Sequence, residues 1–254
     1  MQITRFERGL RDRVALVTGA AIGNGRAFCE RLAEEGAKLV IADLEEAVDT
    51  ERAVLELGGE VVSIRADMTD PADVERVVRT AIERYGHIDI LVHNVGHYSE
   101  EPFELLSFAE WKKTLEITLD SIFHTVRAVL PHMKRAGFGR IITFSSDTVW
   151  LGTPYLTHYV TAKMGVIGFT RSIAAEVGKY GITVNTITVG LTATQNAGTS
   201  SVMSPLLEHI IPAQAVHRAD EPEDIANVVA FLALPASGII TGQTINVDGG
   251  VARH

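Results

Sequence analysis

Residues 13–25 read RVALVTGAAIGNG and combine a strand pattern with a glycine-rich turn. The first residues are apolar and partly β-branched, which indicates a buried strand. A helical pattern follows over residues 25–35. Glycines allow a tight turn close to an anion, and a helix directs its first N–H groups at that anion. The segment therefore predicts a strand–turn–helix unit that holds a pyrophosphate.

Further strands of the same kind alternate with helical patterns along the chain. The predicted strands span residues 13–19, 38–43, 60–67, 88–96, 139–146, 182–190 and 244–250. Helical patterns include residues 25–35, 71–85 and 222–234. This alternation predicts an α/β fold, a Rossmann-like doubly wound parallel sheet of about seven strands in a single domain, 1–254. The irregular segment 191–215 is expected to be a substrate loop.

Composition narrows the class of protein. The chain has 254 residues, 46% of them apolar, with a formal net charge of −9 and one cysteine, Cys29, which we expect to be packed in a helix. We see no basic stripe, so a nucleic-acid partner is not expected. The N-terminus has no apolar signal region and no run of residues is long enough to span a bilayer. We therefore expect a cytoplasmic protein with no membrane partner, and no metal, because His and Cys do not cluster.

An acid ends the second predicted strand. Asp43 lies 24 residues after Gly19, where a carboxylate can accept hydrogen bonds from both ribose hydroxyls of NAD. The same charge repels the 2′-phosphate of NADP, and Ile22 leaves the glycine turn without a cation there. Asp43 therefore predicts NAD as the cofactor. The alternative is that Asp43 caps the next helix.

Other strand ends supply further cofactor candidates. Asp67 can accept from an adenine amino group or cap the helix that begins near Pro71. Asn94 and Gly96 end the fourth strand, where a ribose needs small neighbours. The expected cofactor set is Gly19, Gly23, Asn24, Gly25, Asp43, Leu44, Asp67, Met68, Asn94, Gly96, Tyr159, Lys163, Val189, Gly190, Leu191 and Thr192.

A phenol, an ammonium and a hydroxyl are spaced so that they can meet at one site. Tyr159 and Lys163 are one helical turn apart, and Ser146 stands thirteen residues before Tyr159, at the end of the fifth strand. Tyrosine is a weak base at its ordinary pKa of about 10, but a nearby cation favours the phenolate. We therefore expect Lys163, together with the positive nicotinamide ring of bound NAD⁺, to lower the pKa of Tyr159. Tyr159 is then the expected acid/base, and Ser146 is expected to hold the substrate oxygen.

The substrate side is mostly apolar. The expected substrate-binding residues are Ser146, Thr148, Trp150, Leu151, Tyr155, His97, Met203 and Leu207. Such a set suits a small apolar secondary alcohol or ketone, including an aryl one. Trp150 can alternatively be core packing. His158 and His209 are expected to be polar surface residues.

The chain resembles the short-chain dehydrogenase/reductase family over nearly its whole length. The resemblance rests on TGAAIGNG, DMTD (67–70), HNVG (93–96), the set Ser146, Tyr159 and Lys163, and ITGQTINVDGG (240–250). It implies a seven-stranded Rossmann-like sheet, a Ser–Tyr–Lys mechanism and a homotetramer. The stretch from Trp150 to Arg171 and the C-terminus also resemble NAD-dependent 1-phenylethanol and pyridoxal 4-dehydrogenases.

Four positions depart from the family pattern. The family's catalytic Asn falls on Thr118, whose single hydroxyl has a shorter reach. His93 occupies a position that commonly braces the sheet, Asn24 replaces Ile in the glycine turn, and Val189 replaces Pro near the nicotinamide. Departures at Thr118, Asn24 and Val189 leave open a non-catalytic NAD-binding sensor or scaffold. A second alternative to an NAD-dependent alcohol dehydrogenase is a 3-oxoacyl thioester reductase, against which Asp43 and the acidic charge argue.

Overall fold

One parallel sheet organises the protein. The computed structural model describes residues 9–194 and 209–253, and its seven strands have the order β3-β2-β1-β4-β5-β6-β7. The strands are β1 (Val14–Thr18), β2 (Lys38–Asp43), β3 (Val61–Arg65), β4 (Ile90–His93), β5 (Gly139–Ser146), β6 (Ile182–Val189) and β7 (Thr244–Val247). Every neighbouring pair is parallel. The predicted α/β Rossmann-like fold is confirmed.

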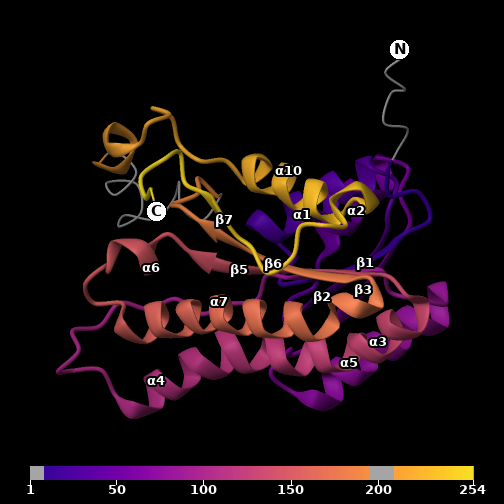
Figure 1. Ribbon diagram of the computed structural model, residues 1–254, viewed down its shortest axis with the longest axis horizontal. Helices are drawn as coiled ribbons and strands as arrows, with labels where there is room; N and C mark the ends of the chain where they lie inside the picture. Colours follow the sequence, from indigo (N-terminus) through magenta and orange to yellow (C-terminus); the bar gives the residue numbers. More distant parts are fainter. Residues whose placement is uncertain (1–8, 195–208, 254) are drawn as a thin grey trace.

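Helices cover both faces of this sheet (Figure 1). On one face lie α1 (Gly23–Glu34), α2 (Val48–Glu56) and α10 (Pro222–Ala233); on the other lie α3 (Pro71–Tyr85), α5 (Ser121–Ala136) and α7 (Thr157–Val177). Two shorter helices, α4 (Phe108–Leu115) and α6 (Thr148–Leu151), lie toward the end of the sheet at which β5 terminates. None of the helices in the described ranges is long and apolar enough to cross a membrane.

The strand ends that differ most from the predicted ones are those of β4 and β7, each three residues early, where polar groups end the ladders. After β4, Asn94 turns toward β1: its backbone N donates to Thr18 Oγ1 and its Nδ2 donates to the Gly19 carbonyl. After β7, the Asp248 carboxylate accepts hydrogen bonds from the backbone N–H groups of Gly250 and Ala252, which closes a turn. Alternating patterns do not reveal such side-chain caps.

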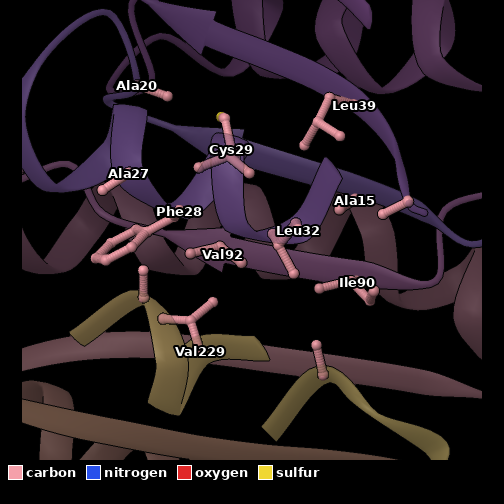
Figure 2. Close-up of a cluster of buried hydrophobic side chains, with 14 of the residues drawn as sticks. Ala15, Ala20, Ala27, Phe28, Cys29, Leu32, Leu39, Ile90, Val92 and Val229 are labelled. Atoms are coloured by element: carbon pink, nitrogen blue, oxygen red, sulfur yellow. The ribbon is translucent and has the colours of Figure 1, made fainter. Parts of the chain in front are cut away.

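A buried apolar cluster packs α1 and α10 against one face of the sheet (Figure 2). Phe28 and Leu32 of α1 contribute to it, with Val229 from α10. The Phe28 ring stacks on that of Phe144 of β5, with 4.9 Å between centroids. Cys29 is buried in the same cluster and free, and burial raises the pKa of its thiol, so its predicted packing position is confirmed.

Truncation of the stacked ring tests how much the cluster contributes to stability. Phe28 is fully buried, so Phe28→Ala should lower the free energy of unfolding by about 3–5 kcal/mol through lost burial and a residual cavity. Phe28→Leu, which keeps most of the apolar volume, should lower it by about 1–2 kcal/mol. Urea unfolding measures both values. Equal losses in the two variants would contradict this account.

Candidate active site

The glycine turn brings the N-terminus of α1 against the end of β1. Gly19 has a φ of 64°, in the left-handed region that favours glycine. A Cβ placed on Gly25 would lie 2.1 Å from the Gly19 carbonyl oxygen, so no larger residue can occupy that position. The predicted strand–turn–helix unit is present, and its helix begins at Gly23, two residues earlier than expected.

Asp43 holds this turn from the end of β2. Its Oδ2 accepts from the Ala21 backbone N at 2.8 Å and its Oδ1 accepts from the Glu45 backbone N at 3.0 Å. The N-cap residue of α2 is Ala47, so the alternative of Asp43 as a helix cap is wrong. Leu44 follows with its side chain 57% exposed. The carboxylate thus links the second strand to the turn.

A cavity of about 460 Å³ opens beside Asp43. It is lined by Gly19, Asp43, Leu44, Ala66, Asp67, Met68, Thr69, Asn94, Val95, Gly96, His97, Glu116 and Ile117. Asp67 Oδ1 accepts from both the backbone N and Oγ1 of Thr69, and α3 is capped by Asp70 instead. The alternative of Asp67 as the cap of that helix is therefore wrong.

The sequence analysis did not identify a basic residue, Arg65, that lies near Asp43. Arg65 ends β3 as the register partner of Asp43, and its Nε donates to the Leu44 carbonyl at 2.8 Å. The guanidinium therefore lies beside the acid that we used to predict NAD. Pairing register, which the sequence does not state, is what brings these two residues together.

A second cavity of about 460 Å³ contains the Ser, Tyr and Lys candidates. Its lining also includes Asn24, His97, Tyr98, Glu100, Phe144, Asp147, Thr148, Leu151, Leu156, Val189, Gly190, Leu191, Thr192, Thr194 and Ile210. Asn94, Gly96 and His97 line both cavities, so one continuous cleft follows the carboxyl ends of the strands. Sequence analysis missed Asp147 and Leu156 because no motif marks them, whereas Ile210 falls in the predicted substrate loop 191–215.

Some expected substrate residues do not line this cleft. Trp150 is partly buried and its Nε1 donates to Thr188 Oγ1 at 3.5 Å, and Tyr155 is 58% exposed with a φ of 65°. Neither residue lines the cavity that holds Tyr159. Met203 and Leu207 lie outside the described residues. Thr148, Leu151 and His97 do line the cavity.

Lys163 lies one turn after Tyr159 on α7, which begins at Thr157, so the predicted helical spacing of the pair is confirmed. Its Nζ donates to the Phe144 carbonyl at 3.0 Å, and the residue is 6% exposed. Burial lowers the pKa of Lys163 to about 8. The ammonium is therefore fixed to the strand that carries Ser146.

The surroundings of Tyr159 in the protein raise its pKa. Burial raises it to about 12; a hydrogen bond with Ser146 lowers it and the charge of Asp147 raises it. The expected lowering of this pKa depends on Lys163 together with the positive nicotinamide ring of bound NAD⁺, so it stays a prediction. Within the protein, loss of hydration penalises the phenolate.

Three buried carboxylates surround the end of β6. They are Asp147, Asp220 and Asp248, each less than a tenth exposed. Burial raises the pKa of Asp147 to about 6, and the charge of Asp248 adds to the effect. Burial and the charge of Asp248 likewise raise the pKa of Asp220 to about 6. The Oδ2 atom of Asp220 has no hydrogen-bond partner among the described residues.

Thr118 lies in a π-helical turn, Glu116–Asp120, between α4 and α5. Its Oγ1 accepts from the His97 backbone N at 3.1 Å, so the hydroxyl holds the start of the loop after β4. His93 is buried and its Nε2 lies 3.0 Å from Ser121 Oγ, which ties β4 to α5. Burial lowers the pKa of His93 to about 3, so the imidazole is neutral. His93 therefore braces the sheet, as expected.

His158 is fully buried, and the expectation that it lies on the surface is wrong. Its Nε2 lies 2.9 Å from Ser99 Oγ, which donates to Glu110 Oε1. The same carboxylate oxygen lies 2.7 Å from His97 Nε2. The loop after β4 folds over α7, and this placement removes His158 from water. His209 is exposed, as expected. Over residues 9–194 and 209–253, no group of His, Cys, Asp and Glu could hold a metal ion.

The raised pKa of Asp220 predicts how stability depends on pH. The folded protein binds a proton at Asp220 up to about pH 6, whereas the ordinary pKa is 3.8. Stability therefore falls as pH rises through this window, by about 1–2 kcal/mol. Asp220→Asn should raise the free energy of unfolding by about that amount near pH 7.5 and leave it unchanged near pH 4, as measured by urea unfolding.

Asp224 provides the matched control. Hydrogen bonds from Arg218 lower the pKa of Asp224, so its ionised form stabilises the fold. Asp224→Asn should therefore reduce stability near pH 7.5, with the opposite sign. A loss of stability in Asp220→Asn at that pH would contradict the assignment.

The chain is similar to proteins of known sequence along nearly its whole length. A family described as enoyl-(acyl carrier protein) reductase matches residues 19–252. The short-chain reductase protein NovJ of Streptomyces niveus is 39% identical over 94% of both chains. A (2S)-[(R)-hydroxy(phenyl)methyl]succinyl-CoA dehydrogenase subunit of Thauera aromatica is 37% identical over 95% of this chain and 97% of its own.

Solved structures of similar fold and sequence also match nearly the whole chain. The crystal structure of levodione reductase superposes with a TM-score of 0.89, at 34% identity over 94% of this chain and 97% of the other. That of a putative short-chain alcohol dehydrogenase from Sinorhizobium meliloti gives 0.91, at 30% identity over 96% and 98%. The fold, the cleft and these similarities agree: the chain belongs to the short-chain dehydrogenase/reductase family, oxidoreductases that act on alcohols or ketones with a nicotinamide cofactor, NAD or NADP.

Proposed function

We propose that this protein transfers hydride between NAD(H) and a small apolar secondary alcohol or ketone, including aryl ones. The observation that carries the proposal is the continuous cleft from Asp43 to Ser146, in which Tyr159 and Lys163 lie at the substrate end. A dinucleotide needs an elongated cleft of this kind at the carboxyl ends of parallel strands.

The residues of the cleft suit a dinucleotide. Gly25 leaves the turn open to a pyrophosphate, because any side chain there would strike the Gly19 carbonyl. Asn24 Oδ1 is buried without a hydrogen-bond partner in the described structure and lines the same cavity as Lys163. A Cβ on Gly96 would lie 3.3 Å from Lys163 Nζ, so a larger residue there would crowd the ammonium. We propose that Lys163 binds the nicotinamide ribose.

NAD is the proposed form of the cofactor. The Asp43 carboxylate keeps lone pairs beyond those that accept from Ala21 and Glu45, and these suit the two ribose hydroxyls. An exposed Leu44 offers no charge to a 2′-phosphate. Arg65 is the one feature here that favours NADP, and its Nε is already bonded to the Leu44 carbonyl.

The three polar residues divide the proton transfer between them. Tyr159, with a pKa near 12, is a suitable proton donor to a carbonyl oxygen at neutral pH. When bound, the oxidised cofactor supplies a hydride acceptor and a positive charge that favours the phenolate. In the oxidising direction Tyr159 then takes the alcohol proton, while Ser146 holds the substrate oxygen. Thr118 acts indirectly, by fixing the backbone of His97 at the mouth of the cleft.

Apolar side chains at the substrate end support a compact hydrophobic substrate. Leu151, Leu156, Leu191 and Ile210 line this part of the cavity with the ring of Tyr98. Tyr98 packs edge-on against Tyr159, with 5.4 Å between ring centroids. The names of two relatives refer to a ketone and to a phenyl-bearing substrate, and the resemblance to 1-phenylethanol and pyridoxal 4-dehydrogenases points the same way.

Two other functions compete with this one. Reduction of a 3-oxoacyl thioester is favoured by similarity to a 3-oxoacyl-[acyl-carrier-protein] reductase of Synechocystis, 34% identical over 95% of this chain and 98% of that protein. An acidic carrier would meet a protein of net charge −9, which weakens this alternative. A non-catalytic NAD-binding protein rests on the departures at Thr118, Asn24 and Val189, and an intact Ser–Tyr–Lys set argues against it. We also propose, from the family resemblance, a homotetramer.

Removal of the phenolic hydroxyl tests the proposed acid/base. Tyr159→Phe should keep cofactor affinity and lower turnover by at least about 100-fold, because general acid–base catalysis is lost. Absorbance at 340 nm with NAD⁺ and a panel of secondary alcohols that includes 1-phenylethanol measures the turnover. The control is Tyr155→Phe, since Tyr155 does not line the cavity, and it should retain activity. Full turnover in Tyr159→Phe would overturn the assignment.

Two substitutions at Asp43 separate charge from structure. Asp43→Ala should weaken NAD binding by about tenfold, because charge-assisted hydrogen bonds are lost. It should also reduce the ratio of NAD affinity to NADP affinity. Asp43→Asn keeps an acceptor for the Ala21 N–H, so it should narrow the preference with less loss of affinity. Calorimetric titration of the parent and both variants with NAD and NADP measures the six affinities. Tighter binding of NADP by the parent protein would refute the choice of NAD and implicate Arg65.

A further inference from the structure

The carboxylate of Asp147 contacts the hydroxyl that we propose to hold the substrate oxygen. Ser146 Oγ donates to Asp147 Oδ1 over 3.2 Å. Thr148 donates to the same Ser146 oxygen twice, from its Oγ1 at 2.9 Å and from its backbone N at 3.3 Å. A hydroxyl has one proton and two lone pairs. The acceptor side of Ser146 is therefore filled by Thr148, and its only proton is directed at Asp147.

A second acceptor for that proton lies in the same cavity. A hydrogen bond with Ser146 favours the ionised form of Tyr159, and the charge of Asp147 disfavours it. The hydrogen bond stabilises the phenolate, whereas the negative charge of Asp147 repels it. In addition, the single Ser146 proton cannot serve both oxygens at once. Asp147 is 7% exposed, so little water weakens its competition for the proton.

We propose that ionised Asp147 is a positioning residue that draws the Ser146 hydroxyl proton away from the Tyr159 phenolate and from the substrate oxygen. Its effect on turnover rests on the proposed function. The consequence is directional: alcohol oxidation, which needs the phenolate, should require more alkaline conditions than it would without Asp147. Protonation of Asp147 removes its charge and releases the Ser146 proton.

The charges around Asp147 place this change in the accessible pH range. Burial raises the pKa of Asp147 to about 6, Ser146 and Thr148 lower it by hydrogen bonding, and Asp248 and Asp220 raise it by repulsion. These carboxylates come from the segments that follow β7 and precede α10. From α7, Tyr159 and Lys163 line the same cavity, and the Lys163 Nζ is held by the Phe144 carbonyl. At neutral pH the Asp147 carboxylate is therefore mostly ionised.

The contact can be tested without turnover. A ¹³C NMR titration of side-chain carboxyl carbons, from about pH 4.5 to 8, follows Asp147, whose signal is the one that Asp147→Asn removes. Ser146→Ala should raise the Asp147 midpoint by about one pH unit, since the ionised form loses its donor. The control is Ser145→Ala: Ser145 Oγ donates to the Lys163 carbonyl, and the midpoint should stay in place. A midpoint that Ser146→Ala leaves unmoved would overturn the proposal.

The consequence is tested by the pH profile of kcat/KM for oxidation of 1-phenylethanol with NAD⁺. Because oxidation needs the phenolate, kcat/KM should rise with pH. Asp147→Ala should lower the midpoint of this rise by about one pH unit and increase kcat/KM near pH 7.5 by about tenfold. Asp147→Asn, which keeps an acceptor without the charge, should shift it part of the way. Asp220→Asn should leave the midpoint in place, because Asp220 is not among the groups that shift the pKa of Tyr159.

The two experiments separate this inference from the proposed function. If neither Asp147 variant moves the midpoint of the rise in kcat/KM with pH, the positioning role is refuted. If the parent protein oxidises no alcohol of the panel but Ser146→Ala moves the Asp147 midpoint, the proposed function fails and the Ser146–Asp147 contact is supported.

Discussion

Parallel strands that all end at one edge of the sheet are the constraint on which the rest of the structure depends. Their backbones point the same way, so the residues that follow β1, β2, β4, β5 and β6 meet although they are far apart in sequence. The glycine turn, Asp43, Asn94 and Ser146 all lie at this edge. The helices on both faces keep the strands buried and the edge fixed (Figure 1).

Burial governs the chemistry of this edge. The same loss of water lowers the pKa of Lys163 to about 8 and raises those of Tyr159 to about 12 and of Asp147 to about 6. All three shifts favour the neutral form. A site of this kind is sensitive to each charge brought into it, which is why a bound cationic ring or a nearby carboxylate can decide the state of the phenol. The Ser146 hydroxyl donates to Asp147 and lowers the pKa of Tyr159, so it couples these two groups.

Much of the fold and part of the site follow from local patterns. Seven apolar runs predict the seven strands, and all were found, because a parallel strand covered on both faces must be apolar nearly throughout. The helical spacing of Tyr159 and Lys163 predicts their shared face. Strand ends were less accurate: Asn94 and Asp248 terminate ladders through hydrogen bonds to residues that no periodicity reveals.

By itself the sequence determined the order of strands and helices, the glycine turn and the Ser–Tyr–Lys set, since each depends on residues close together in the chain. Only the tertiary structure decided which side chains lose water and which become neighbours. It buried His158, set Arg65 beside Asp43, left Trp150 and Tyr155 off the cavity, and gathered Asp147, Asp220 and Asp248. Burial and proximity across the sheet depend on long-range packing, and they fix the pKa values on which proton transfer depends.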